Sequence, residues 1–216
     1  MELHSIDYKD WFINQKRIPD KESVEHEMFF DFHRELCMNG FMMDGVYINP
    51  FLYWHLNIWH TEVDVLDDYG RINQKYANPL LRDNEWIVTN EIDRAHKERK
   101  GLVILGIRRF AKSVLEASYI GHGATFDENS QNIIAGLNAP DIKLITDKID
   151  KGLNFIPEAW RWQRIEDNWK NQVTLGIKTK SGERIPFSQI LIRNLDEGNN
   201  EEAIAGTKPR RLIIDE

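Results

Sequence analysis

The segment that most constrains this chain is residues 106–113, an eight-residue stretch between a short apolar run and a helical pattern. The run before it, residues 102–105 (LVIL), is flanked by glycines, which is typical of a fully buried parallel strand. The sequence after it, SVLEASYIGHG, predicts a helix over residues 113–123. A strand, a glycine-started loop and a helix in this order favour an α/β fold.

The loop itself, GIRRFAKS, matches the phosphate-binding pattern GxxxxGK[ST] except at Ala111, which replaces the second glycine. Such a loop points successive backbone N–H groups at a phosphate, and the helix N-terminus adds the positive end of its dipole. Lys112 would bring an ammonium group to the β- and γ-phosphates, and Ser113 would offer its hydroxyl to Mg²⁺. The residues expected to bind ATP with Mg²⁺ are Gly106, Ile107, Arg108, Arg109, Phe110, Ala111, Lys112 and Ser113.

Two features of this loop leave alternatives open. An alanine in a left-handed conformation costs roughly 1 kcal/mol, so Ala111 weakens the match to the pattern. Arg108 and Arg109 are either solvated loop residues or a clamp on the γ-phosphate or on a neighbouring acidic group.

A second motif lies at residues 211–216, where an apolar run predicts a strand that ends in two adjacent carboxylates. A P-loop ATPase needs one carboxylate near its Mg²⁺ and usually another to polarise the attacking water. We assign Asp215 to the magnesium side and Glu216 to the general base. Because a working enzyme would not end at these carboxylates, we expect the sequence to be a fragment of a longer protein.

The expected fold class is an α/β P-loop NTPase with a mostly parallel sheet, incomplete, carrying a β-hairpin insertion. The expected domains are an aromatic-rich, lid-like subdomain at 1–75 and the ATPase core at 76–216. In the core we predict a helix opened by Asp83 and another opened by Pro140. Strands are predicted at 131–135 and 211–214, a hairpin from VTLGIKT and RIPFSQILIRNL, and a short helix at 199–205.

The first 75 residues carry several local signals. Ser23 predicts the start of a helix and Gly40 its end, while Asn49 and Pro50 predict the start of a second helix. The first helix places Val24, Met28, Phe32 and Leu36 on roughly one face. A short strand at 63–66 and a turn at 67–70 should follow. The aromatic side chains of residues 47–59 pack a small subdomain in the simpler interpretation, and stack on nucleobases in the alternative.

The charge and the cysteine content indicate which partners and which cellular compartment to expect. With 35 acidic against 28 basic residues, the net charge is −7, so any contact with DNA must be local. The basic residues Arg94, Lys97, Arg99 and Lys100 are either such a contact or a solvated helix end. One cysteine, Cys37, favours a buried thiol in a reducing cytoplasm.

Other ionisable residues and the chain termini give weaker signals. The seven histidines lack a metal-binding spacing, and His55 and His60 are expected at a polar edge of the aromatic subdomain. Neither a secretory signal nor a transmembrane run is expected.

With both motifs placed, the chain resembles the N-terminal ATPase region of tailed-phage terminase large subunits. The resemblance rests on GVYINPFLYWHLNIW, on the segment from Pro79 to Phe126, and on RRLIIDE. An arginine four residues before the lysine is typical of that family, and Arg108 holds this position. Ala111 departs from the glycine common there.

The resemblance implies an ATPase of a viral DNA-packaging motor, with ATP and Mg²⁺ as cofactors. Implied catalytic residues are Glu216 and Arg108, and Ser113 and Asp215 are the implied magnesium ligands. Residues 83–86 are either a contact to adenine or an ordinary helix start. The implied partners are double-stranded DNA, the portal and procapsid, the small terminase subunit and further copies in a ring, in the host cytoplasm without a membrane. It also implies a nuclease domain beyond Glu216. Two alternatives stay open: another P-loop DNA motor such as a helicase, and a non-catalytic nucleotide-binding or assembly module.

Overall fold

The computed structural model of this protein describes residues 19–67, 69–105, 112–195 and 207–215. It divides into two compact units, Met1–Phe110 and Ala111–Glu216. Helix α3, Asp83–Glu98, packs on α2, Pro50–Asn57, within the first unit. The first unit of the structure therefore includes the helix at residues 83–98.

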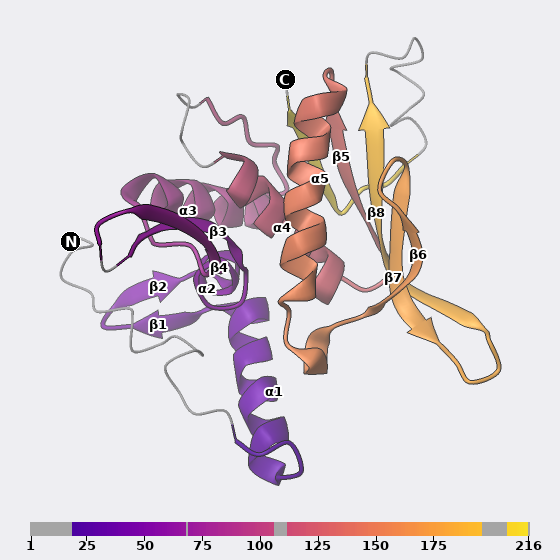
Figure 1. Ribbon diagram of the computed structural model, residues 1–216, viewed down its shortest axis with the longest axis horizontal. Helices are drawn as coiled ribbons and strands as arrows, with labels where there is room; N and C mark the ends of the chain where they lie inside the picture. Colours follow the sequence, from indigo (N-terminus) through magenta and orange to yellow (C-terminus); the bar gives the residue numbers. More distant parts are fainter. Residues whose placement is uncertain (1–18, 68, 106–111, 196–206, 216) are drawn as a thin grey trace. The chain divides into compact units, whose positions relative to one another are not determined.

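The first described helix of this unit is α1, Val24–Asn39 (Figure 1). Its ends follow the sequence signals, because the Ser23 side chain accepts a hydrogen bond from the His26 N–H and Gly40 caps the C-terminus at a φ of 67°. Of the four apolar side chains predicted to share one face, Val24, Met28 and Phe32 are exposed and Leu36 is half-buried, whereas the buried residues of α1 are Phe30, His33 and Cys37. The expected buried thiol is therefore confirmed.

The core of the first unit is helix α2, which follows a small hairpin of β1, Phe41–Met43, and β2, Val46–Ile48. Asn49 caps α2 as predicted, its side chain accepting a hydrogen bond from the Leu52 N–H at 2.7 Å. Tyr53, Trp54 and Trp59 are almost completely buried. Their rings are therefore used in core packing, as the simpler interpretation of the aromatic segment predicted.

A second hairpin, β3 (Thr61–Leu66) and β4 (Ile72–Ala77), leads to α3. The turn between the strands is organised by Asp67, whose carboxylate accepts bonds from the Tyr69 and Arg71 N–H groups at 2.9 and 2.8 Å. The strand and turn predicted here are confirmed, while β4 carried no recognised sequence signal.

The prediction of a buried strand at residues 102–105 is wrong. The structure assigns no strand there, and Val103 and Leu105 are 84% and 88% exposed. A four-residue apolar run fixes hydrophobicity but supplies no partner, and a strand forms only where another strand offers its backbone groups. The described strands lie at residues 41–77 and 130–215, and each pairs with another of these strands and not with residues 102–105.

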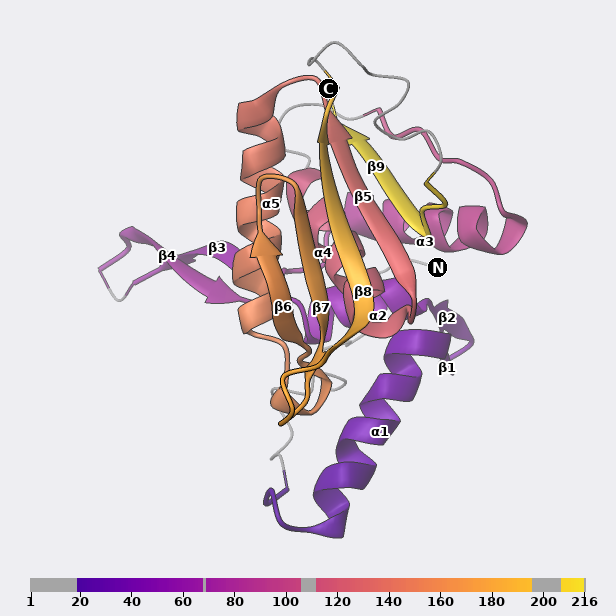
Figure 2. The ribbon, with the colours of Figure 1, turned by 90° about the vertical axis from the view of Figure 1, so that its right-hand side faces the viewer.

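In its described residues, the second unit has a five-stranded sheet and the α-helices α4 and α5 (Figure 2). The strands run in the order β6-β7-β8-β5-β9. Its elements are α4 (Lys112–Phe126), β5 (Ser130–Gly136), α5 (Ala139–Asn154), a 3-10 helix (Glu158–Trp160), β6 (Gln163–Asn168), β7 (Gln172–Lys178), β8 (Arg184–Asn194) and β9 (Arg211–Asp215).

This sheet is mixed, and the expectation of a mostly parallel sheet needs correction. β5 pairs in parallel with both β8 and β9, but β6, β7 and β8 form an antiparallel meander. The predicted hairpin thus extends the sheet itself instead of standing apart from it. The predicted strands at 131–135 and 211–214 and the helices after Lys112 and Pro140 are confirmed. The helix expected at 199–205 lies outside the described residues.

Helices α4 and α5 pack on the same face of the sheet, and Figure 2 shows both of them behind the strands. Gly123 of α4 lies against Asn132, and Ile142 of α5 lies against Gly136. Asn132 and Gly136 are an even number of residues apart on β5, so their side-chain positions face the same way. Among the described helices, none has the length and hydropathy needed to cross a membrane.

Candidate functional site

The carboxyl ends of the parallel strands meet at one edge of the sheet. Gly136 at the end of β5 pairs with Asn194 of β8 on one side and with Asp215 of β9 on the other. In open α/β sheets this edge is where ligands bind, because the loops and helix N-termini that follow the strands converge there. The first residue of α4, Lys112, lies at the same edge.

Lys112 reaches Asp215 and forms an ion pair with its carboxylate. A lysine in the first turn of a helix opposes the helix dipole, which favours negative charge at that end. Helix stability therefore gives no reason for this residue, whereas a negatively charged partner does. The Lys112 side chain is 38% exposed and that of Asp215 is 17% exposed, so solvent and ligands can reach the pair.

The opposite end of β9 is attached to α4 by a buried arginine. Arg211 donates to the Tyr119 carbonyl at 2.6 Å and to the Asp127 carboxylate at 3.0 Å, and its Nη2 lies 2.6 Å from Nδ1 of His122. From Arg211 to Asp215 the strand spans about 13 Å, and from Lys112 to Tyr119 the helix spans about 11 Å. These matched lengths let Arg211 hold the helix on the strand while Lys112 faces Asp215.

A second carboxylate, Glu116, lies one helical turn after Lys112. Its Oε1 is 3.8 Å from the lysine Nζ, and its side chain is only 12% exposed. Within the described part of the chain, its Oε2 is buried and makes no hydrogen bond. Burial, and secondly the charge of Asp215, raises the pKa of Glu116 to about 7, although Lys112 acts in the opposite direction.

The described residues thus include Lys112, Ser113 and Asp215 of the predicted nucleotide site. Lys112 and Asp215 are brought together, and Ser113 follows Lys112 in the first turn of α4, half-buried. Glu116 was missed by the sequence interpretation; its i+4 spacing from Lys112 on a predicted helix indicates that the two residues are neighbours, but not that the carboxylate is buried. The other members of the site lie outside the described residues: Gly106, Ile107, Arg108, Arg109, Phe110, Ala111 and Glu216.

The other residues that the sequence analysis considered are the histidines, possible metal ligands and the basic residues near the end of α3. Across residues 19–67, 69–105, 112–195 and 207–215, no three His, Cys, Asp or Glu side chains are grouped to hold a metal ion. His55 is completely buried, so its expected place at a polar edge is wrong. Three of the basic residues near the end of α3 form ion pairs with acids of the same segment: Arg94 with Glu91, Lys97 with Asp93 and Lys100 with Glu98.

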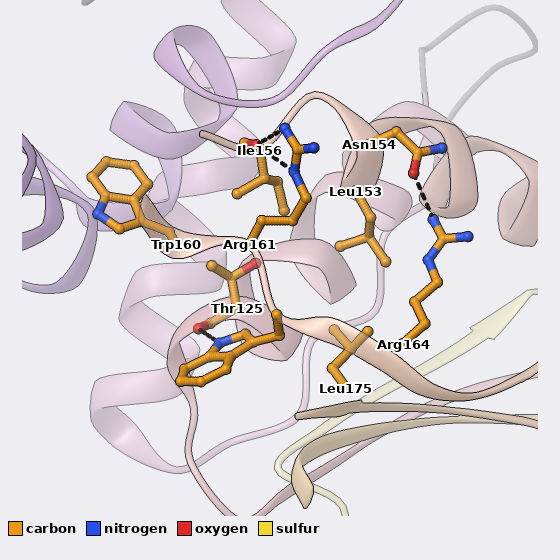
Figure 3. Close-up of a pocket in the computed structure, with 9 residues that line it drawn as sticks. Thr125, Leu153, Asn154, Ile156, Trp160, Arg161, Arg164 and Leu175 are labelled. Atoms are coloured by element: carbon orange, nitrogen blue, oxygen red, sulfur yellow. Dashed lines mark hydrogen bonds between the residues drawn. The ribbon is translucent and has the colours of Figure 1, made fainter. Parts of the chain in front are cut away.

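A cavity of about 330 Å³ lies near the C-terminal ends of α4 and α5 (Figure 3). Thr125 of α4 lines it, and Thr125 is about 20 Å along the helix from Lys112. The cavity is therefore separate from the ion pair. Its lining residues are Thr125, Leu153, Asn154, Ile156, Trp160, Arg161, Trp162, Arg164 and Leu175.

The polar groups of this cavity are largely used within the fold. Arg161 donates twice to the Ile156 carbonyl, at 2.9 and 2.6 Å, and Arg164 donates to Asn154 at 3.1 Å (Figure 3). Trp162 donates to the Thr125 carbonyl at 3.0 Å. These bonds connect the end of α5 and the start of β6 to α4. The polar groups around the cavity therefore hold these three segments together.

Comparison of the chain with protein-family models and with curated proteins gave no match.

Proposed function

We propose that this chain is the ATP-binding and ATP-hydrolysing part of a viral DNA-packaging motor of the terminase large-subunit type. The observation that supports it is the Lys112–Asp215 ion pair at the carboxyl edge of the parallel strands. The two residues are 103 positions apart, and the two sequence motifs assigned them to the two halves of one nucleotide site.

The donor groups at this edge fit Mg²⁺-ATP. An ammonium suits phosphate oxygens, and a hydroxyl with a carboxylate suits Mg²⁺, which prefers oxygen ligands. In the proposed site Lys112 would bind the β- and γ-phosphates, and Ser113 and Asp215 would hold Mg²⁺. When bound, Mg²⁺ neutralises negative charge that develops on the phosphates. Because Lys112 pairs with Asp215, a bound phosphate would compete with a carboxylate for the Lys112 ammonium group.

The remaining steps are assigned to residues outside the described segments. Arg108 would contact the γ-phosphate, and Glu216 would accept a proton from the attacking water. In the whole motor, hydrolysis would drive translocation of double-stranded DNA into a procapsid at the portal, together with the small subunit and further copies in a ring.

Substitution of Lys112 by alanine should weaken Mg²⁺-ATP binding by about 10- to 150-fold, because a hydrogen bond to a charged group contributes about 1.5–3 kcal/mol. Titration calorimetry on the folded chain measures this change. Lys143→Ala is the matched control, since Lys143 is an exposed lysine of α5 that also pairs with a carboxylate. Equal affinities for wild type and Lys112→Ala would show that the ion pair is not a nucleotide site.

A second experiment separates the motor from its alternatives. Stimulation of ATP hydrolysis by procapsid portal supports the packaging motor, whereas stimulation by single-stranded DNA supports a helicase. Nucleotide binding that persists without any hydrolysis, in a chain whose Glu216→Gln variant behaves identically, supports a binding or assembly module.

A further inference from the structure

The strongest unassigned group near the candidate site is the carboxylate of Glu116. Glu116 lies on α4, one turn after Lys112. Among the described residues, the ion-pair partner of its carboxylate is the Lys112 ammonium group, at 3.8 Å. Its second oxygen is buried without a hydrogen bond in the same part of the chain. Burial of a charged carboxylate costs free energy, and a cation that stays beside it offsets this cost.

Ordinary helix stabilisation does not explain this arrangement. A lysine four residues before a glutamate is the less favourable order for an i,i+4 pair, and the lysine also opposes the dipole at the helix start. The placement therefore stabilises neither the helix nor the buried carboxylate well. It does leave one ammonium group shared between two carboxylates, Glu116 and Asp215.

We propose that Glu116 competes with nucleotide phosphates for the Lys112 ammonium and thereby limits the affinity of the site. This inference rests on the proposed ATP-binding function. Phosphate must draw Lys112 away from Asp215 and Glu116, and Mg²⁺ can compensate Asp215 but does not replace the partner of Glu116. A negative charge beside the phosphates also repels them, since charges several ångströms apart interact strongly in a half-buried site. Glu116 is thus a positioning residue that acts through Lys112 and favours release of nucleotide.

At pH 8, where the Glu116 carboxyl group is mostly ionised, Glu116→Gln should tighten Mg²⁺-ATP binding by about tenfold, which corresponds to about 1.4 kcal/mol. Glutamine keeps the shape of the side chain and removes only its charge. Glu116→Asp keeps the charge but is one methylene shorter, so it withdraws the carboxylate from Lys112 and should tighten binding by less than Glu116→Gln. Asp147→Asn, at an exposed carboxylate of α5, removes one negative charge elsewhere and should leave the affinity unchanged. Calorimetric titrations of these variants, with Lys112→Ala in the same series, provide the comparison.

The direction of the change separates this role from a structural one, because a damaged fold weakens binding and does not tighten it. Unchanged or weaker binding by Glu116→Gln, with normal loss in Lys112→Ala, overturns the competition and leaves the proposed function intact. Equal tightening in Asp147→Asn or in Glu116→Asp also overturns it. If neither wild type nor Glu116→Gln binds Mg²⁺-ATP, both the inference and the proposed function fail.

Discussion

Replacement of Gly123 by alanine should lower the free energy of unfolding of the Ala111–Glu216 unit by about 3 kcal/mol or more. A Cβ atom at this position would lie within 3.0 Å of Asn132 Oδ1 and of Nε and Cδ of Arg211. Neither side chain can move aside at low cost. Arg211 is buried and tied to three groups of the α4 segment, and Asn132 is buried beneath the same helix.

The expected loss combines overpacking with disruption of a buried charge network. Urea unfolding followed by circular dichroism measures it, and Gly101→Ala is the control because a Cβ there meets nothing within 4 Å. The variant should also lose nucleotide affinity, since Arg211 holds α4 along β9 and so keeps Lys112 opposite Asp215. A destabilisation below about 1 kcal/mol would mean that Arg211 shifts easily and does not fix the helix on the strand.

The contact between Gly123 and Arg211 could not be predicted from the sequence. The helix around it was predicted from local periodicity, but nothing local indicates that Arg211, 88 positions later, is buried against it. Caps and turns were predicted well, as at Ser23 and Asn49, because their hydrogen bonds are formed within a few residues. The strand at 102–105 was predicted wrongly, because an exposed apolar run and a buried one have the same sequence pattern.

The candidate site was predictable to a similar extent. Lys112 and Asp215 were assigned to one site from two motifs, and the structure places them in contact. Glu116 was not assigned, because its role depends on burial and on its distance from Lys112, which spacing alone does not give. The five-strand order and the antiparallel meander were also missed, since strand pairing is set by contacts between distant segments.

Acid should destabilise the first unit through His55, by about 2–3 kcal/mol between pH 7.5 and pH 4.5. The ring is completely buried, and neither of its nitrogens has a hydrogen-bond partner among the described residues. Burial lowers the pKa of His55 to about 3, from 6.5 for the free side chain. Between these values the unfolded chain binds a proton that the folded chain excludes. Stability is therefore complete above pH 6.5 and falls as the pH falls towards 3.

The comparison of wild type with His55→Leu isolates this contribution. Glu116 in the second unit has the opposite effect, because its raised pKa makes folding less favourable as the pH rises from about 4.5 to 7. The pH dependence of the whole chain therefore mixes both signs, whereas the difference between the two proteins contains only His55. In urea unfolding, the stability of His55→Leu minus that of wild type should be about 2–3 kcal/mol larger at pH 4.5 than at pH 7.5, because only wild type loses the contribution of the buried neutral ring in acid. An unchanged difference for His55→Leu would mean that the buried ring accepts a proton in the folded state and has a partner that stabilises its charge.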